Sequence, residues 1–422
     1  MKKTLLLLLV FTIISSTEVL ALPRFALKKG DVTCGGCHQN PMGGGLRTKG
    51  GESFSINALP MWKRGDSFTG AISEGITIGA DFRSQFLYFA QQYPLYNDFG
   101  VRIKDTTSCI KSFHAMSYAV ELGVKATNTL FGYLRYDPLS APAEGYAMLH
   151  FVHSSGELFQ AGDVINDAYL KVGAFLPAYG IRFDDHTVYA RGGNSDISRF
   201  GGAGLFWGYG YRDEGGELGA FFFDHIGVQI GVYNGNESNY FSNFIGKNPN
   251  LAISARLNVA GELVEDLLSG EIGGSIYTHP RTDNTGVSVP LSLFAIHGGV
   301  SVGPVSLLAE YDDGKNIVLS GGSSIPFVKA ITLEGSVTIM TGLYGMARFE
   351  TFKQYSDESK TILFGTEVKN RLMIGAQWFP LRFVEIRPEF RLATVTAPNI
   401  SDPTIRDDIK QTTFLVQTHI FF

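Results

Sequence analysis

The chain ends in Thr413-Phe414-Leu415-Val416-Gln417-Thr418-His419-Ile420-Phe421-Phe422, and the fold class is clearest in these ten residues. Apolar residues recur along it with a period of two, which puts them on one face of a β-strand. They are Phe414, Val416, Ile420 and Phe422, with Thr418 between them. The sequence therefore predicts that the chain finishes in a strand with one apolar face and an aromatic last residue.

The same alternation recurs upstream, at residues 76–83, 118–125, 251–259, 331–339 and 384–392. Runs of about ten residues follow one another from about residue 70 onward, with Gly, Asn, Asp and Pro between them. A strand that crosses a bilayer needs about 9–11 residues. The faces opposite the apolar residues carry charges of both signs, which suits a wet lumen. A periplasmic sandwich or propeller is the alternative, because the period alone does not say which face is buried.

The composition supports an all-β membrane protein. The 422 residues include 50 glycines, 32 phenylalanines and 18 tyrosines, and the formal net charge is −5. These dispersed charges indicate no nucleic-acid partner. Apart from the N-terminus, the sequence holds no apolar run near the ~20 residues of a membrane helix. Aromatic residues gather at the ends of the strand-like runs, as an interfacial girdle requires. They are Tyr88, Phe89, Tyr311, Trp378 and Phe379.

The C-terminal stretch resembles the last strand of bacterial outer-membrane barrels, which the assembly machinery recognises. In lipid every backbone polar group must be bonded internally, so such strands have to close into a barrel. About 350 residues remain after the N-terminal segment. At roughly 22 residues per strand with its share of turn and loop, they make about 16 antiparallel strands, an even number as in bacterial barrels. Residues 66–422 are thus expected to form a porin-like transmembrane β-barrel in the lipid outer membrane.

Residues 1–21 have the features of a secretory signal peptide. Lys2 and Lys3 precede an apolar run over residues 5–14, and Val19-Leu20-Ala21 forms a small-residue cleavage site. The mature protein would begin near Leu22, outside the cytoplasm.

Cys34-Gly35-Gly36-Cys37-His38 has the spacing for covalent attachment of one c-type haem. Each thiol can form a thioether with a haem vinyl group, and the histidine then becomes the proximal ligand of the iron. The alternatives are a redox disulfide, which would need a βαβ context, and half of a zinc site. The only other cysteine, Cys109, is far away and is expected in a loop or turn.

The N-terminal segment resembles that of fused outer-membrane monohaem cytochrome–porins, in Pro23-Arg24-Phe25-Ala26 followed by the Cys34–His38 motif. In that family a short haem segment precedes a porin barrel, and iron-oxidising bacteria use it to take electrons from Fe(II). Residues 40–51 depart from the phenylalanine-glycine-arginine and lysine-leucine-asparagine-glycine pattern of the iron-oxidising members. The resemblance thus implies one haem plus a barrel more strongly than it implies Fe(II) as donor.

Residues 22–65 are rich in glycine and poor in aliphatic side chains, so they cannot build a haem pocket alone. We expect them to act as a monohaem plug in the barrel lumen. Met42, Met61 and His419 are the candidate second axial ligands, and His419 is expected to point into the lumen near the periplasmic end. For each, a packing methionine or a polar lumen residue is the ordinary alternative. A five-coordinate iron with an open distal position is a further alternative.

Residues 168–186 resemble the strand-to-loop passage of phosphate-selective-type porins, where a lysine-valine-glycine strand leads to a proline, a glycine and a long loop. In those porins a long loop folds into the lumen and narrows it. The resemblance implies that residues near a constriction bind or filter ions. The candidates are Arg182, Asp184, Asp185, His186 and Arg191. A surface loop with turn and water contacts is the alternative.

The sequence shows no nucleophile elbow, phosphate loop or credible triad, so we expect an electron-transfer protein rather than an enzyme. The haem would exchange electrons between an extracellular metal ion or other redox partner and a periplasmic carrier such as a soluble cytochrome. One haem cannot bridge a ~30 Å hydrocarbon layer. A partner must therefore enter the lumen, or the exchange stays on one side. Two alternatives are a diffusion porin with a structural haem plug and a haem enzyme or sensor with an open distal site.

Overall fold

The structure is a computed structural model, and it describes most of the chain from residue 23 onward. The signal-peptide prediction for residues 1–21 lies outside the described residues. The described residues are 23–63, 68–97, 102–139, 144–153, 157–162, 164–183, 185, 187–191, 205, 212–235, 250–280, 288–318, 324–361, 363, 367–398 and 406–422.

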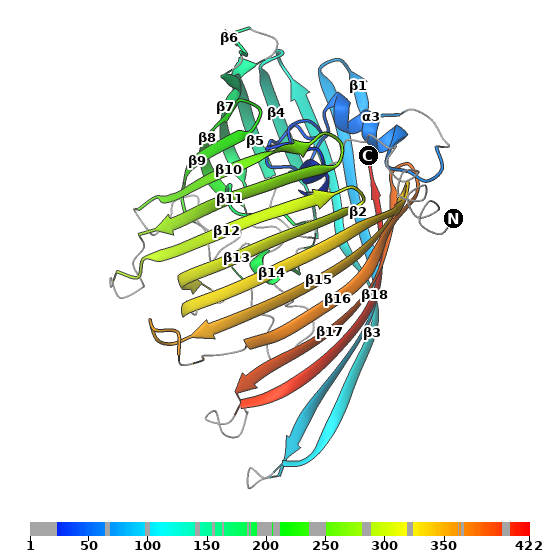
Figure 1. Cartoon of the computed structure of the whole chain (residues 1–422), viewed down its shortest axis with the longest axis vertical. Helices are drawn as coiled ribbons and strands as arrows, with labels where there is room; N and C mark the ends of the chain where they lie inside the picture. Colours follow the sequence, from blue (N-terminus) through cyan, green and yellow to red (C-terminus); the bar gives the residue numbers. More distant parts are fainter. Residues whose placement is uncertain are drawn as a thin grey trace, which may run out of the picture.

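Within these ranges, sixteen long strands pair antiparallel with their neighbours in chain order, and β18 closes the sheet by pairing with β2 (Figure 1). The predicted all-β barrel of about 16 antiparallel strands is therefore confirmed. The sixteen are β2 (Ile76–Tyr96), β3 (Arg102–Lys125), β4 (Leu130–Tyr136), β5 (Glu144–His153), β7 (Ile165–Phe175), β8 (Asp213–Phe222), β9 (Ile226–Tyr233), β10 (Ala252–Val264), β11 (Leu268–His279), β12 (Leu291–Val302), β13 (Val305–Val318), β14 (Ser324–Met340), β15 (Leu343–Tyr355), β16 (Glu367–Leu381), β17 (Val384–Pro398) and β18 (Arg406–Phe421). The short strands β1 (Ala71–Ser73) and β6 (Phe159–Gln160) lie beside them.

The outer face of the barrel is apolar and its inner face is polar. On β10, Ile253 and Leu257 are 44% and 51% exposed, whereas the intervening Ser254 and Asn258 are buried inside. The same alternation holds on β18, where Phe414 and Ile420 face outward. A soluble sandwich would bury the apolar face, so this inversion is that of a barrel that spans a membrane.

The two ends of the barrel differ. The C-terminus lies at the upper end in Figure 1, where short turns such as residues 223–225 and 303–304 join the strands. Short turns are the periplasmic feature of bacterial barrels, so this is the periplasmic end.

At the opposite end, β2 and β3 extend far beyond the expected ten residues. Cys109 pairs with Ala90 inside this hairpin and is exposed. The expectation that Cys109 lies in a loop is therefore wrong, because the β3 strand continues through it.

Not all the predicted girdle residues face lipid. Phe89 and Phe379 are 3% and 4% exposed and point into the barrel, so their assignment to the girdle is wrong. Successive side chains on a strand point to opposite faces, and each of these two residues lies next to one that points outward.

Two segments fill part of the lumen. The first is residues 23–63, which carry helices α2 (Pro23–Lys28) and α3 (Lys49–Asn57) and which we call the plug. The second consists of residues 176–183, 185 and 187–191 after β7, which we call the inward connection; it includes the 3-10 helix η1 (Tyr189–Arg191). None of the helices in the described part of the chain is long and apolar enough to cross a membrane.

Candidate functional site

The plug lies inside the periplasmic mouth and is held there by apolar contacts with the wall (Figure 1). Phe25 of α2 packs on Tyr344 of β15, with ring centroids 5.2 Å apart, and on Phe54 of α3. At the rim, the backbone N–H of Met61 donates to the carbonyl of Phe379 at 2.8 Å. The barrel thus supplies the core that the plug lacks, as its composition predicts.

Local hydrogen bonds shape the Cys34–His38 motif into a single turn. The backbone N–H groups of Cys37 and His38 both donate to the Cys34 carbonyl, at 3.1 and 2.8 Å. Gly51 of α3 packs so closely that a Cβ there would lie 2.1 Å from the Cys37 carbonyl oxygen. Gly43, with φ +84°, allows the same approach to the Cys34 sulfur, which a Cβ would meet at 3.2 Å. Glycine at these two positions therefore allows close approach to the Cys37 backbone and to the Cys34 sulfur.

The His38 ring is oriented by the loop that follows it. Its Nδ1 lies 3.2 Å from the carbonyl oxygen of Gly45, and the side chain is buried. Histidines that bind metals commonly donate one ring N–H to a carbonyl or carboxylate, which fixes the tautomer and presents the other nitrogen. The residues present therefore fit a c-type haem: Cys34 and Cys37 for the thioethers, and Nε2 of His38 for the iron.

The electrostatics of the two thiols argue against a redox-active pair. Burial, with the Asp31 carboxylate nearby, raises the pKa of Cys34 to about 12 and that of Cys37 to about 11. Reactive Cys-x-x-Cys pairs have a lowered thiol pKa, since the thiolate is the nucleophile.

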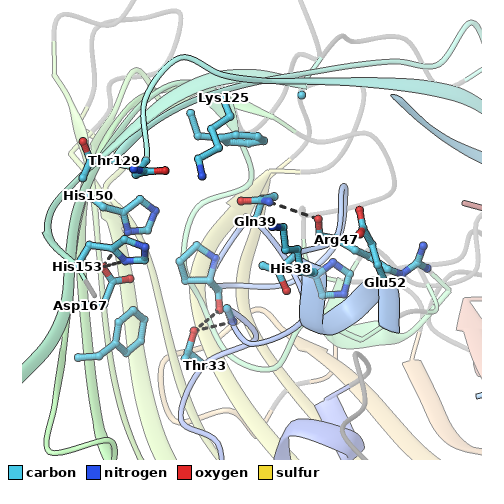
Figure 2. A pocket seen from close by; sticks show the side chains of 18 of the residues that line it. Thr33, His38, Gln39, Arg47, Glu52, Lys125, Thr129, His150, His153 and Asp167 are labelled. Carbon is cyan, nitrogen blue, oxygen red and sulfur yellow. Dashed lines mark hydrogen bonds and ion pairs between the residues drawn. The ribbon is translucent and has the colours of Figure 1, made fainter. Parts of the chain in front are cut away.

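A cavity of about 1490 Å³ lies between the plug and the part of the wall that runs from β1 and β2 to β10. Ordinary small-molecule pockets hold about 300–1,000 Å³, so this cavity has room for a large planar group. His38 and Thr33 line the plug side, and His150, His153 and Asp167 line the wall side (Figure 2). The sequence analysis missed these three wall residues.

The three predicted distal ligands do not line this cavity. Met42 is buried within the plug, and Met61 is tied to the rim. His419 points into the lumen, but its Nδ1 lies 3.0 Å from Glu385 and its Nε2 lies 3.2 Å from Asp81. The two carboxylates engage both ring nitrogens of His419. Ligation by any of the three stays a prediction.

The inward connection crosses the lumen to the opposite wall. Tyr179 donates to Asp312 of β13 at 3.0 Å, and the Gly180 N–H donates to Ser275 of β11 at 2.8 Å. Further along, Asp185 accepts from Arg348 of β15 at 2.7 Å and from Arg391 of β17 at 3.2 Å.

Asp185 and Arg182 are the predicted constriction residues whose side chains the structure describes. Asp185 is buried against lumen arginines, and Arg182 donates from Nη1 to the Gly43 carbonyl at 2.5 Å, joining the inward connection to the plug. Arg191 ends η1, but its side chain lies outside the described part, as do Asp184 and His186.

No protein-family model matches the sequence, and no curated protein matches it either. Among solved structures, OprB of Pseudomonas putida is similar at 10% identity and a TM-score of 0.48, over 87% of this chain and 100% of that one. The outer membrane channel DcaP of Acinetobacter baumannii is similar at 10% identity and a TM-score of 0.48, over 83% of this chain and 99% of that one. An anion-selective porin from Comamonas acidovorans is similar at 11% identity and a TM-score of 0.49, over 82% of this chain and 99% of that one. The fold itself rests on the strand pairing described above.

Proposed function

We propose that this chain is a porin-type barrel of the outer membrane that carries one covalent haem c on its plug and exchanges electrons at the periplasmic mouth. The observation that carries the proposal is the orientation of His38, whose Nδ1 is bound by Gly45 beside the large cavity. A c-type haem bound there would supply a one-electron redox centre.

The chain's own residues account for the rest of the proposed site. Cys34 and Cys37 would fix the group, and the Gly45 carbonyl would hold the His38 ring in one orientation. The buried Phe25, Phe54 and Tyr344 would fix the plug against the wall, so that the site does not move relative to the barrel.

The position of the plug favours exchange on the periplasmic side. The C-terminus and the plug share the end of the barrel with the short turns. Because one haem cannot bridge ~30 Å of hydrocarbon, a soluble periplasmic carrier such as a cytochrome is the proposed partner. An extracellular metal ion would need to pass through the lumen to reach the same site.

The test uses full-length protein inserted in one orientation into lipid vesicles, with a reduced soluble cytochrome c added to either side. We expect reduction of the bound haem from the periplasmic side, and none in the matched Cys34→Ala/Cys37→Ala variant. Added CO should leave the reduced spectrum unchanged if a second protein ligand is present. Haem that stays oxidised with the donor on the periplasmic side would contradict the proposal.

The porin-type fold and the charged lumen favour a second function, a diffusion porin in which the haem is a structural staple. The lumen wall carries Arg348, Arg371 and Arg391 facing carboxylates such as Glu350, a polar lining like that of solute channels. Planar-bilayer recording separates the two functions. A large, steady ion current with no donor-driven haem reduction would establish the porin, whereas reduction with a closed pore would establish electron transfer.

A further inference from the structure

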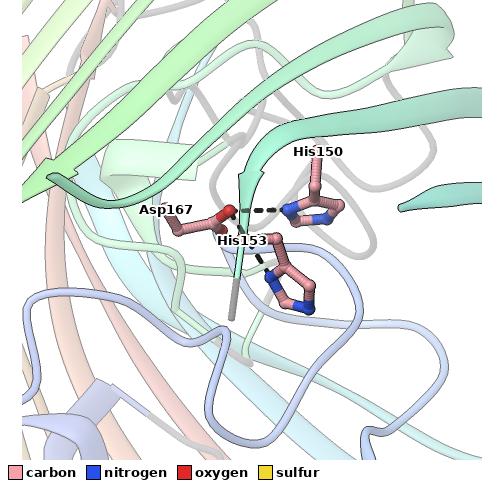
Figure 3. A group of neighbouring side chains, drawn as sticks. All are labelled: His150, His153 and Asp167. Atoms are coloured by element: carbon pink, nitrogen blue, oxygen red, sulfur yellow. Dashed lines mark hydrogen bonds and ion pairs between the residues drawn. The ribbon is translucent and has the colours of Figure 1, made fainter. Parts of the chain in front are cut away.

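On the cavity wall opposite the plug, His150, His153 and Asp167 converge on one point (Figure 3). His150 and His153 belong to β5, and Asp167 belongs to the neighbouring β7. One ligand atom from each can be chosen so that all three lie within 4.8 Å of one another. Among the described residues, this is the one group of three or more histidines, cysteines and carboxylates so arranged.

A β-bulge brings the two histidines together. Residues 150 and 153 would point to opposite faces of a regular strand, because side chains alternate. Here the pairing of β5 with β7 shifts by one residue between His150 and Val152. The bulge moves His153 to the lumen face beside His150, and their ring centroids lie 5.1 Å apart. Bulges commonly re-aim side chains at functional sites.

A simple histidine–carboxylate hydrogen bond accounts for only part of this arrangement. His150 Nδ1 lies 2.8 Å from Oδ1 of Asp167, which is an ordinary hydrogen bond. His153 Nδ1 lies 3.8 Å from the same oxygen, beyond hydrogen-bond range. Two imidazoles thus face one carboxylate, and only one of them is within hydrogen-bond distance of it.

The three side chains also remain accessible to an ion. Their exposed fractions are 15% for His150, 36% for His153 and 24% for Asp167, so each is partly open to the cavity. Both acidic and basic residues line the same cavity, with Asp31 and Asp224 among the acidic ones and Lys125 among the basic ones. A cation can therefore reach the group and keep water in its remaining positions.

We propose that His150, His153 and Asp167 bind a divalent first-row transition-metal ion on the wall of the plug cavity. Two imidazoles and one carboxylate form the ligand set of mononuclear sites that keep open positions. Ligand atoms about 2.0–2.2 Å from one ion lie closer together than 4.8 Å, so small side-chain rotations complete the site. The site does not depend on the haem, and its ligands come from the wall alone.

The test is titration of the purified full-length protein in detergent with Co(II), measured by isothermal titration calorimetry. We expect one bound ion, and at least a tenfold loss of affinity in His150→Ala, His153→Ala and Asp167→Asn. His225→Ala is the matched control. His225 lines the same cavity, and its Nδ1 lies 3.1 Å from the Ala260 carbonyl.

One further measurement keeps the result clear. Heat-modified migration on gels shows whether each variant still forms the barrel. Co(II) binding that is equal in the wild type and the His150→Ala/His153→Ala double variant would overturn the proposal, as would the absence of binding to a folded wild type.

Discussion

The plug and the inward connection both occupy the lumen, but they are held there in different ways. The plug packs apolar side chains such as Phe25 and Phe54 on the wall. The inward connection also packs Ile181 and Tyr189 on the wall, but it adds buried charge pairs, with Asp185 between Arg348 and Arg391. Apolar packing fixes the plug as a platform for chemistry, whereas the charge pairs bring a carboxylate into the path along the lumen. A shared compartment therefore does not imply a shared role.

The largest expected effect comes from removing the charge that anchors the inward connection. Asp185→Asn should lower the free energy of unfolding by about 3–5 kcal/mol, because it breaks a buried ion-pair network at one partner. Urea unfolding in lipid vesicles measures this. Asp105→Asn is the control, since its pair with Arg102 is exposed. Equal losses in the two variants would show that the connection is not held by charge.

The plug should respond to pH through Asp31. Burial raises the pKa of Asp31 to about 6 from its ordinary value of 3.8. Because the folded plug holds this proton more tightly than the unfolded chain, its stability should fall as pH rises from about 4 to about 6 and then level off. The loss should be at most about 3 kcal/mol. Rates of limited proteolysis of the plug at these pH values test this, and Asp31→Asn should abolish the dependence.

The sequence predicted the barrel, because period-two alternation recurs along the chain and its last residue, Phe422, is aromatic. The Cys34–His38 motif could be recognised because its spacing is local, but the turn that it forms was not predicted. The sequence could not predict which way Phe379 faces, because a shift of one residue along a strand moves a side chain to the opposite face. The group of His150, His153 and Asp167 was beyond reach, because it depends on a bulge and on the pairing of β5 with β7.

A smaller effect is expected where α3 approaches the motif. Gly51→Ala would place a methyl group against the Cys37 carbonyl and should destabilise the docked plug by about 1–3 kcal/mol. Faster proteolysis of the plug and a lower haem content per barrel would report it. Gly162→Ala is the control, since a Cβ there meets nothing within 4 Å. Identical behaviour of the two variants would show that the motif tolerates movement.

The smallest effect should come from the link between the two regions. Arg182→Ala removes the hydrogen bond to the Gly43 carbonyl and should cost about 1 kcal/mol. It should speed proteolysis of the plug slightly while leaving the inward connection in place, and the exposed Arg102→Ala is the control. A change as large as that of Asp185→Asn would mean that the two regions dock as one unit.

The central claim is that a plug bound inside a membrane-spanning barrel carries a haem. Intact-mass and visible spectroscopy of the protein purified from outer membranes test it most directly. We predict a mass higher by one haem, located by proteolysis between residues 34 and 37, and a spectrum that changes on reduction. A colourless protein of unmodified mass, or one recovered in the soluble fraction, would contradict the account.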